Sequence, residues 1–174
     1  MEELIIKSQN GDKEAFTEAI YEIRHELFKV AKCRLSNEDD IEDSVQETMI
    51  IAFQSIKKLK NVGSFKPWII QILINECNKI YKKNYSKNIS IENEVLENMC
   101  KTTSKYQNLE ELDFNSILNG LNYNEKVAIT LFYLEDYSIA DIAKILKTNP
   151  NTIKTRLRRG KDKIKNNYFE GGVN

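Results

Sequence analysis

The sequence has few of the residues that interrupt helices or bind metals. Its 174 residues include only two prolines and six glycines, and the alternation of apolar and polar residues that is typical of strands is scarce. The single histidine, His25, has no ligand set beside it, and no CxxC or paired His/Cys arrangement is present to build a zinc site. We therefore expect an all-α protein with no metal site and no cofactor.

The three cysteines do not predict a disulfide framework. Cys33, Cys77 and Cys100 are widely spaced and odd in number. They fit either buried apolar positions or redox sensors, and buried positions are favoured.

Neither a long apolar run nor an excess of one charge is present. The longest apolar stretch is too short to span a bilayer and no signal peptide opens the chain, so we expect a cytoplasmic protein without membrane insertion. Lys plus Arg and Asp plus Glu both number 26, so a nucleic-acid surface requires segregation of charge. Segregation is present, because residues 36–55 contain six acidic residues and no Lys or Arg, whereas residues 66–87 and 151–165 are strongly basic.

Residues 137–161 predict a helix-turn-helix. Ser138 is placed to cap the first helix, with Asp141 three positions later as in a capping box. The turn ends in Asn149 and Pro150, an N-cap followed by a proline at the first helical position. Apolar residues recur at helical spacing on the inner faces; they are Ile139, Ile142, Ala143 and Leu146 in the first helix and Ile153, Leu157, Gly160 and Ile164 in the second.

The outer face of the second helix makes DNA the first partner to consider. Residues 151–165 hold seven basic residues against Asp162 alone, although such a run is also compatible with a merely solvated helix. Helical phase places Lys154, Thr155 and Arg158 toward base edges in the major groove, with flanking cations toward phosphates. The expected DNA-binding residues are Asn151, Thr152, Lys154, Thr155, Arg156, Arg158, Arg159 and Lys161.

Helices are expected along the rest of the chain too. The periodicity predicts helices over 12–35, 40–59 and 66–84, then over 112–118 and 125–134. The first two have buried stripes composed of Phe16, Ile20, Ile23, Leu27, Val30 and Ala31, and of Ile41, Val45, Met49, Ala52, Ile56 and Leu59. A polar stretch over 85–110 reads as a linker between residues 1–84 and 111–174.

The order of these parts resembles an extracytoplasmic-function sigma factor of the sigma-70 family. The segments that carry the resemblance are DIEDSVQETMIIAF, GSFKPWIIQILINECNKIYKK and the basic TIKTRLRRGK, and the likeness covers nearly the whole chain. It implies two small helical domains, a region 2-like domain and a region 4-like helix-turn-helix, joined by a flexible linker. It further implies a protein that is not an enzyme, has no catalytic residue and no small-molecule substrate, and gives bacterial core RNA polymerase its promoter specificity. The family commonly pairs with anti-sigma proteins, so such a partner is also expected.

The resemblance assigns residues to each partner. Asp43, Gln46 and Glu47 match the motif that docks on the clamp-helix coiled coil of the polymerase, and exposed carboxylates there suit pairing with arginines, although an acidic solvated face has the same composition. The helix-turn-helix would read the minus-thirty-five element. The residues expected at the melted minus-ten element, including cations for its phosphates, are Asn61, Gly63, Ser64, Phe65, Lys66, Trp68, Asn75, Lys79, Lys82 and Lys83.

In the expected minus-ten loop, Gly63 would permit a tight backbone approach to a flipped base. Two other points about the minus-ten segment stay open. Trp68 either stacks on an unpaired base or belongs to the core. Ile74 and Lys79 stand where family members often carry an arginine and an acid, which leaves the minus-ten sequence preference open.

Two other classes of function fit parts of the sequence. A DNA-binding regulator would use the same helix-turn-helix without polymerase, but it would not require the tryptophan-bearing basic segment or the acidic helix. A recombinase would need a nucleophile with supporting acid-base or cationic groups, and isolated Ser and Tyr residues form no such constellation.

Overall fold

The computed structural model of the protein describes residues 1–85 and 116–170, and within these ranges it contains helices and no strand. The expected all-α class is confirmed. The chain divides into two compact units, Met1–Lys87 and Asn88–Asn174. The linker expected over 85–110, apart from Tyr85, lies outside the described residues, as do Cys100 and most of the helix expected over 112–118.

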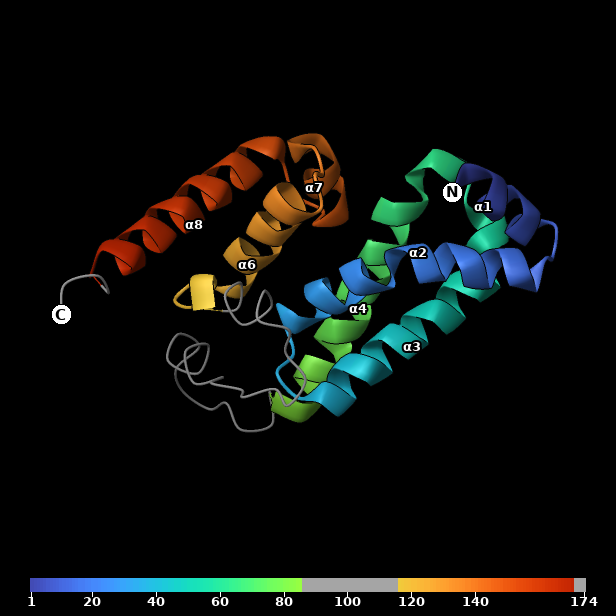
Figure 1. Ribbon diagram of the computed structural model, residues 1–174, viewed down its shortest axis with the longest axis horizontal. Helices are drawn as coiled ribbons and strands as arrows, with labels where there is room; N and C mark the ends of the chain where they lie inside the picture. The colour runs from blue at the N-terminus through green and yellow to red at the C-terminus, as the bar shows by residue number, and fades with distance from the viewer. Residues whose placement is uncertain (86–115, 171–174) are drawn as a thin grey trace. The chain divides into compact units, whose positions relative to one another are not determined.

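The first unit is built from four α-helices and two short 3-10 turns (Figure 1). Helices α2, α3 and α4 pack on one another, and α1 packs on α2 and reaches both 3-10 turns. The elements are α1 (Glu2–Gln9), α2 (Lys13–Lys32), α3 (Glu38–Ser55), η1 (Ile56–Lys58), η2 (Val62–Ser64) and α4 (Phe65–Tyr85).

The starts of α2 and α3 follow from their capping residues. The Asp12 carboxylate accepts a hydrogen bond of 3.0 Å from the Ala15 amide, and the Asn37 side chain accepts one of 3.0 Å from the Asp40 amide. Both residues precede a helix in extended conformation, as N-caps do.

The predicted apolar stripes form a large part of the core of the first unit. All six stripe residues of α2 are buried, as are Ile41, Val45, Ala52 and Ile56. Met49 and Leu59 are only half-buried. Leu59 leaves the stripe because α3 ends at Ser55 and a 3-10 turn follows, which changes the direction of the chain.

Helix α1 was not expected from the sequence. It is eight residues long and buries only Ile5 and Ser8, so it lacks the extended periodicity by which longer helices are recognised. Its place in the fold depends on contacts with residues far along the chain.

The second unit contains α6 (Tyr123–Ile129), the π-helical turn η5 (Thr130–Leu134), α7 (Ile139–Ile145) and α8 (Pro150–Glu170). Asn122 and Glu125 form a full capping box at the start of α6. Helix α8 packs against both α6 and α7, and Ile142, Ile153, Leu131 and Val127 are completely buried between them. Across the described parts of both units, none of the helices has the length and apolar character that crossing a bilayer requires.

Candidate polymerase and nucleic-acid interfaces

Helices α7 and α8 form the expected helix-turn-helix. The Ser138 hydroxyl oxygen accepts a hydrogen bond of 3.1 Å from the Asp141 amide and also donates one of 2.7 Å to the Asp141 carboxylate. The cap is confirmed, but the second half of the box differs, because the Asp141 carboxylate accepts a hydrogen bond from the side-chain hydroxyl of Ser138. This hydrogen bond, followed by one from Lys144, lowers the pKa of the Asp141 carboxyl.

The turn between the two helices fixes where α8 begins. Lys147 has a positive φ of 49°, which turns the chain out of α7. The Asn149 side chain then accepts hydrogen bonds from the amide of Thr152 at 2.8 Å and from its hydroxyl at 3.2 Å. Asn149 is therefore the N-cap, and Pro150 follows at the first helical position. Thr152, an expected DNA contact, is half-buried and held by this cap.

The predicted phase of α8 is confirmed by burial. Ile153 and Leu157 are 0% and 8% exposed, Gly160 is buried, and Ile164 is half-buried. A Cβ added at Gly160 would lie 3.0 Å from Cγ1 of Ile129 in α6. The glycine therefore permits the close approach of α8 to α6, and this contact determines which face of α8 is left for solvent.

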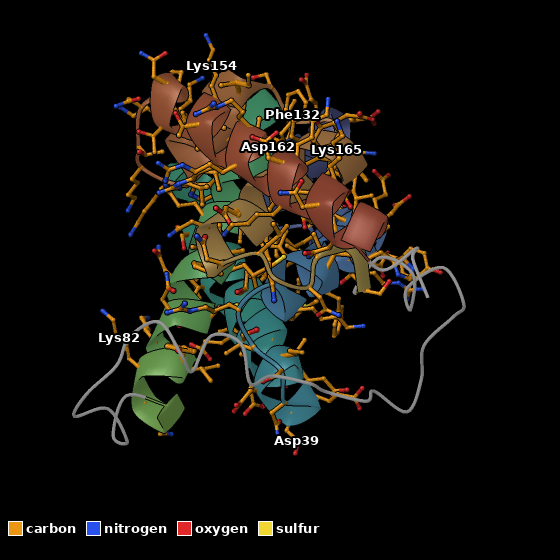
Figure 2. The ribbon with its side chains drawn as sticks, turned by 90° about the vertical axis from the view of Figure 1, so that its left-hand side faces the viewer. Asp39, Lys82, Phe132, Lys154, Asp162 and Lys165 are labelled. Atoms are coloured by element: carbon orange, nitrogen blue, oxygen red, sulfur yellow. The ribbon has the colours of Figure 1, made fainter. Side chains whose placement is uncertain are left out.

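The opposite face of α8 has unpaired positive charge. Lys154, Arg158, Arg159 and Lys161 are exposed and Arg156 is half-buried, and in the described residues none of these five cations has an ion pair. Lys154 projects from the first turns of the helix (Figure 2). The Thr155 hydroxyl donates to the Asn151 carbonyl at 3.0 Å, so its hydrogen is used within the helix, and its acceptor oxygen and its methyl group remain for contact with a base. A face of this kind suits a polyanion.

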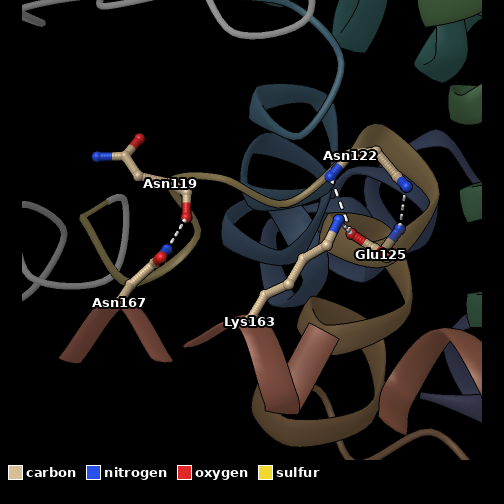
Figure 3. A network of polar contacts seen from close by, with 5 residues as sticks. All are labelled: Asn119, Asn122, Glu125, Lys163 and Asn167. Atoms are coloured by element: carbon tan, nitrogen blue, oxygen red, sulfur yellow. Dashed lines mark hydrogen bonds and ion pairs between the residues drawn. The ribbon is translucent and has the colours of Figure 1, made fainter. Parts of the chain in front are cut away.

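Lys163 is an exception within the basic run. Its Nζ donates a 2.8 Å hydrogen bond to Oε2 of Glu125, a residue that is 4% exposed. The same Glu125 oxygen accepts the Asn122 amide at 3.1 Å, and farther along α8 the Asn167 amide donates to the Asn119 carbonyl at 2.9 Å (Figure 3). This network ties α8 to the start of α6. The sequence contains one signal for part of this network, which is the capping-box spacing between Asn122 and Glu125.

The acidic face of α3 has the exposure that a docking surface requires. Asp43, Gln46 and Glu47 are exposed, and in the described part of the chain they form no ion pair or hydrogen bond. The face continues in Ile50, which is 51% exposed, and in Phe53, which is 38% exposed. The sequence interpretation did not include these two apolar residues. Asp39 marks the beginning of this helix in Figure 2.

The expected minus-ten loop is a short 3-10 turn. The Asn61 side chain accepts a hydrogen bond of 3.1 Å from the Gly63 amide and so caps this turn. Gly63 does not have a positive φ, but a Cβ at this position would lie 2.9 Å from Oε1 of Glu2. The close neighbour of Gly63 in the structure is therefore α1. Ser64, the last residue of the turn, is half-buried.

The two aromatic residues that follow have different environments. Phe65 is 1% exposed, so its ring lies in the core and has no free surface on which the expected contact with DNA could form. Trp68 is half-buried and packs against Phe65 with ring centroids 6.0 Å apart. Trp68 therefore combines a core contact with a partly exposed surface.

Two of the basic residues of α4 have acidic neighbours. Lys66 lies 3.8 Å from the buried carboxylate of Glu26, and Lys79 lies 2.8 Å from Glu76, so each of these expected phosphate contacts already has an acidic neighbour. Asn75, Lys82 and Lys83 are exposed, and Lys82 points away from the helix in Figure 2.

Comparisons with known proteins agree with this geometry. Residues 20–86 match the model of sigma-70 region 2, and residues 112–164 match that of sigma-70 region 4. The ECF RNA polymerase sigma-E factor of Haemophilus influenzae is 30% identical over 181 residues, covering 94% of this chain and 92% of that protein. The RNA polymerase sigma factor SigV of Bacillus subtilis is 28% identical over 154 residues, covering 88% and 91%.

Two solved structures are similar to this chain in fold. The sigma factor RpoE of Bartonella quintana, in complex with the anti-sigma factor NepR, is 26% identical with a TM-score of 0.68, and the match covers 87% of this chain and 94% of that one. CnrH in complex with the cytosolic domain of CnrY has a TM-score of 0.72 over 99% and 98% of the chains, and at 18% identity it shows the fold alone.

A region 2 fold followed by a region 4 helix-turn-helix defines a transcription initiation factor of the sigma type, a class distinct from enzymes. The chain belongs to the extracytoplasmic-function RNA polymerase sigma factors of the sigma-70 family. It is an alternative sigma factor, which directs core RNA polymerase to promoters, and the resemblance found in the sequence is confirmed.

Proposed function

We propose that the two units divide the work of promoter recognition. Residues 1–84 bind core polymerase and the melted minus-ten element, residues 111–174 read the minus-thirty-five element, and residues 85–110 link them. The observation that supports this most strongly is the unpaired basic face of α8, which is held outward by the buried contact of Gly160 with Ile129.

The polymerase docks on the outer face of α3. Asp43 and Glu47 offer two carboxylates one helical turn apart, with the amide of Gln46 beside them. Arginines on the polymerase pair with these carboxylates and reject partners of the wrong charge. Ile50 supplies an apolar contact on the same face, which stays exposed until the polymerase covers it.

Helix α8 enters the major groove of the minus-thirty-five element. Lys154 and Arg158 donate to base edges, guanine being the preferred acceptor, and the Thr155 methyl group contacts a thymine methyl. Asn151 lies on the same face. Arg156, Arg159 and Lys161 contact phosphates, which fixes the register of the helix and makes binding depend on salt.

The minus-ten element is held by the 61–64 turn and by α4. Trp68 stacks a base on its exposed surface while Phe65 supports it from the core. Asn75 donates to or accepts from a base, and Lys82 and Lys83 contact phosphates. Lys66 and Lys79 contribute less, because Glu26 and Glu76 already neutralise part of their charge.

The protein acts in the cytoplasm, with the polymerase and the chromosome. An anti-sigma protein inhibits it by covering these surfaces. The exposed apolar residues Ile50 and Phe53 in the first unit, and Tyr133 and Leu134 in the second, are the contacts such a partner would bury.

A pair of matched variants tests the docking surface. Glu47→Gln and Glu22→Gln make the same chemical change at exposed positions, but Glu22 lies on α2, outside the docking face of α3. We expect Glu47→Gln to weaken the affinity for core polymerase by about tenfold, measured by fluorescence anisotropy of the full chain, and Glu22→Gln to leave it unchanged. Equal effects of the two variants would contradict the assignment of this face.

A further inference from the structure

Gln9, the last residue of α1, binds two backbone carbonyls of the chain segment that leads into the 61–64 turn. Its single Nε2 atom donates two hydrogen bonds, one of 3.0 Å to the Ile56 carbonyl and one of 2.7 Å to the Leu59 carbonyl. These carbonyls lie at the beginning of η1 and immediately after its end. One side-chain amide therefore fixes the direction in which the chain leaves α3.

Helix α1 contacts this segment at its other end as well. Glu2, in the first turn of α1, has its Oε1 2.9 Å from the position that a Cβ of Gly63 would take. Helix α1 thus contacts both η1 and η2. Residues 56–64 are held at their start by the two hydrogen bonds of Gln9, and near their end they lie close to Glu2.

Helix α1 is itself partly buried. Between Glu2 and Gln9, Ile5 is 0% exposed and Ser8 is 1% exposed, and the Ser8 hydroxyl donates to the Leu4 carbonyl at 2.6 Å. Because α1 packs on α2 and buries these two residues, it is held on the core, and Gln9 joins the turn segment to it.

We propose that Gln9 is a positioning residue for capture of the minus-ten element, and this inference rests on the proposed role of the 61–64 turn. A turn that is ordered before DNA arrives loses less conformational entropy when it holds an unpaired base, and it offers its polar groups in one geometry. Gln9 thereby increases the discrimination between bases at the minus-ten element without contacting DNA.

The variant Gln9→Met tests the proposal, because it keeps the length and helix propensity of the side chain and removes both donors. Gln9→Lys restores donors, since an ammonium group can bond both carbonyls. Glu3→Gln is the control, because the Glu3 side chain is 81% exposed and, among the residues that the structure describes, bonds only to Lys7 on the same helix.

Two measurements on the full chain and its holoenzyme decide the matter. Gln9→Met should speed amide hydrogen exchange in residues 59–64 about tenfold, which lies within the range expected for the loss of two neutral hydrogen bonds. It should lower by a similar factor the transcription ratio between the preferred and substituted minus-ten bases. The affinity for core polymerase and the preference at the minus-thirty-five element should not change. Gln9→Lys should recover both losses, and Glu3→Gln should show neither.

The outcomes separate this proposal from the proposed function. If the unaltered protein discriminates minus-ten bases and Gln9→Met discriminates equally well, Gln9 has no positioning role, whether or not hydrogen exchange accelerates. If the unaltered holoenzyme shows no preference at any minus-ten base, the assignment of the 61–64 turn is itself wrong and the role of Gln9 fails with it. Hydrogen exchange of the amides of α1 in Gln9→Met, compared with the unaltered protein, shows whether α1 remains folded.

Discussion

Lys163 donates a hydrogen bond of 2.8 Å to the carboxylate of Glu125, 38 positions earlier in the chain. The Glu125 side chain is 5% exposed and that of Lys163 is 45% exposed, so the pair lies at the edge of the core between α6 and α8. A lysine in the most basic segment of the chain is therefore used to hold the recognition helix.

Lys163→Met should destabilise the second unit. It should not change the affinity of the folded protein for DNA. We expect a loss of about 1–2 kcal/mol in the free energy of unfolding, because a buried carboxylate loses a charged donor while its bond from the Asn122 amide remains. Urea denaturation measures this. Lys161→Met is the matched control, because it should leave stability unchanged and reduce the salt dependence of minus-thirty-five binding by about one phosphate contact. If Lys163→Met reduced the salt dependence of minus-thirty-five binding, Lys163 would contact a phosphate, which would contradict its assignment to a structural role.

Gly160→Val should destabilise the second unit by about 1–3 kcal/mol, because the added carbons overpack the contact with Ile129. A Cβ there would already lie 3.0 and 3.2 Å from two carbons of that side chain, which is itself 3% exposed. Asp162→Val, an exposed β-branched substitution on the same helix, should cost only a few tenths of a kcal/mol. Thermal unfolding followed by circular dichroism compares the two, and equal losses would mean that Gly160 is not at a tight contact.

Cys77 should resist alkylation in the folded protein. Burial raises the pKa of its thiol to about 11, partly offset by a hydrogen bond with Ser44, so very little thiolate is present at pH 8. Iodoacetamide labelling followed by peptide mass spectrometry should show slow modification of Cys77 in buffer and rapid modification in denaturant. Rapid labelling of the native protein at pH 8 would exclude the buried thiol described here.

The carboxylate of Asp141 should stabilise the protein only above the acidic range. The pKa of Asp141 is lowered from its ordinary value of 3.8, so its stabilising contribution is complete above that value and is lost as the pH falls through the lower folded value. Asp141→Asn should therefore reduce the melting temperature at pH 6, and the difference should shrink as the pH falls below 4. A difference that grows at low pH would contradict the direction of the shift.

The sequence predicted those features that repeat along one helix. The phase of α8 follows from Ile153, Leu157 and Gly160, whose spacing allows only one inner face, and the caps at Ser138 and Asn149 depend on residues three positions away. Such features are local, and the structure confirms them.

The features that the sequence did not predict depend on distant contacts. Phe65 and Trp68 are both aromatic and three positions apart, so their spacing alone does not decide which ring enters the core. Lys163 resembles its basic neighbours until its contact with Glu125 is known. Gln9 acquires its role from two carbonyls 47 and 50 positions away, and nothing in the pattern of an eight-residue helix indicates them.

We expect this chain to give core RNA polymerase its choice of promoter, with α3 binding the polymerase and α8 binding the DNA. The most direct measurement is transcription from genomic fragments by bacterial core polymerase from a low-GC host, with and without the purified protein, followed by mapping of the 5′ ends. We predict defined start sites that require the protein and that are lost with Gln46→Ala and with Arg158→Ala. Absence of such transcripts, together with specific binding of duplex DNA by the protein alone, would contradict the account and favour a regulator that acts without polymerase.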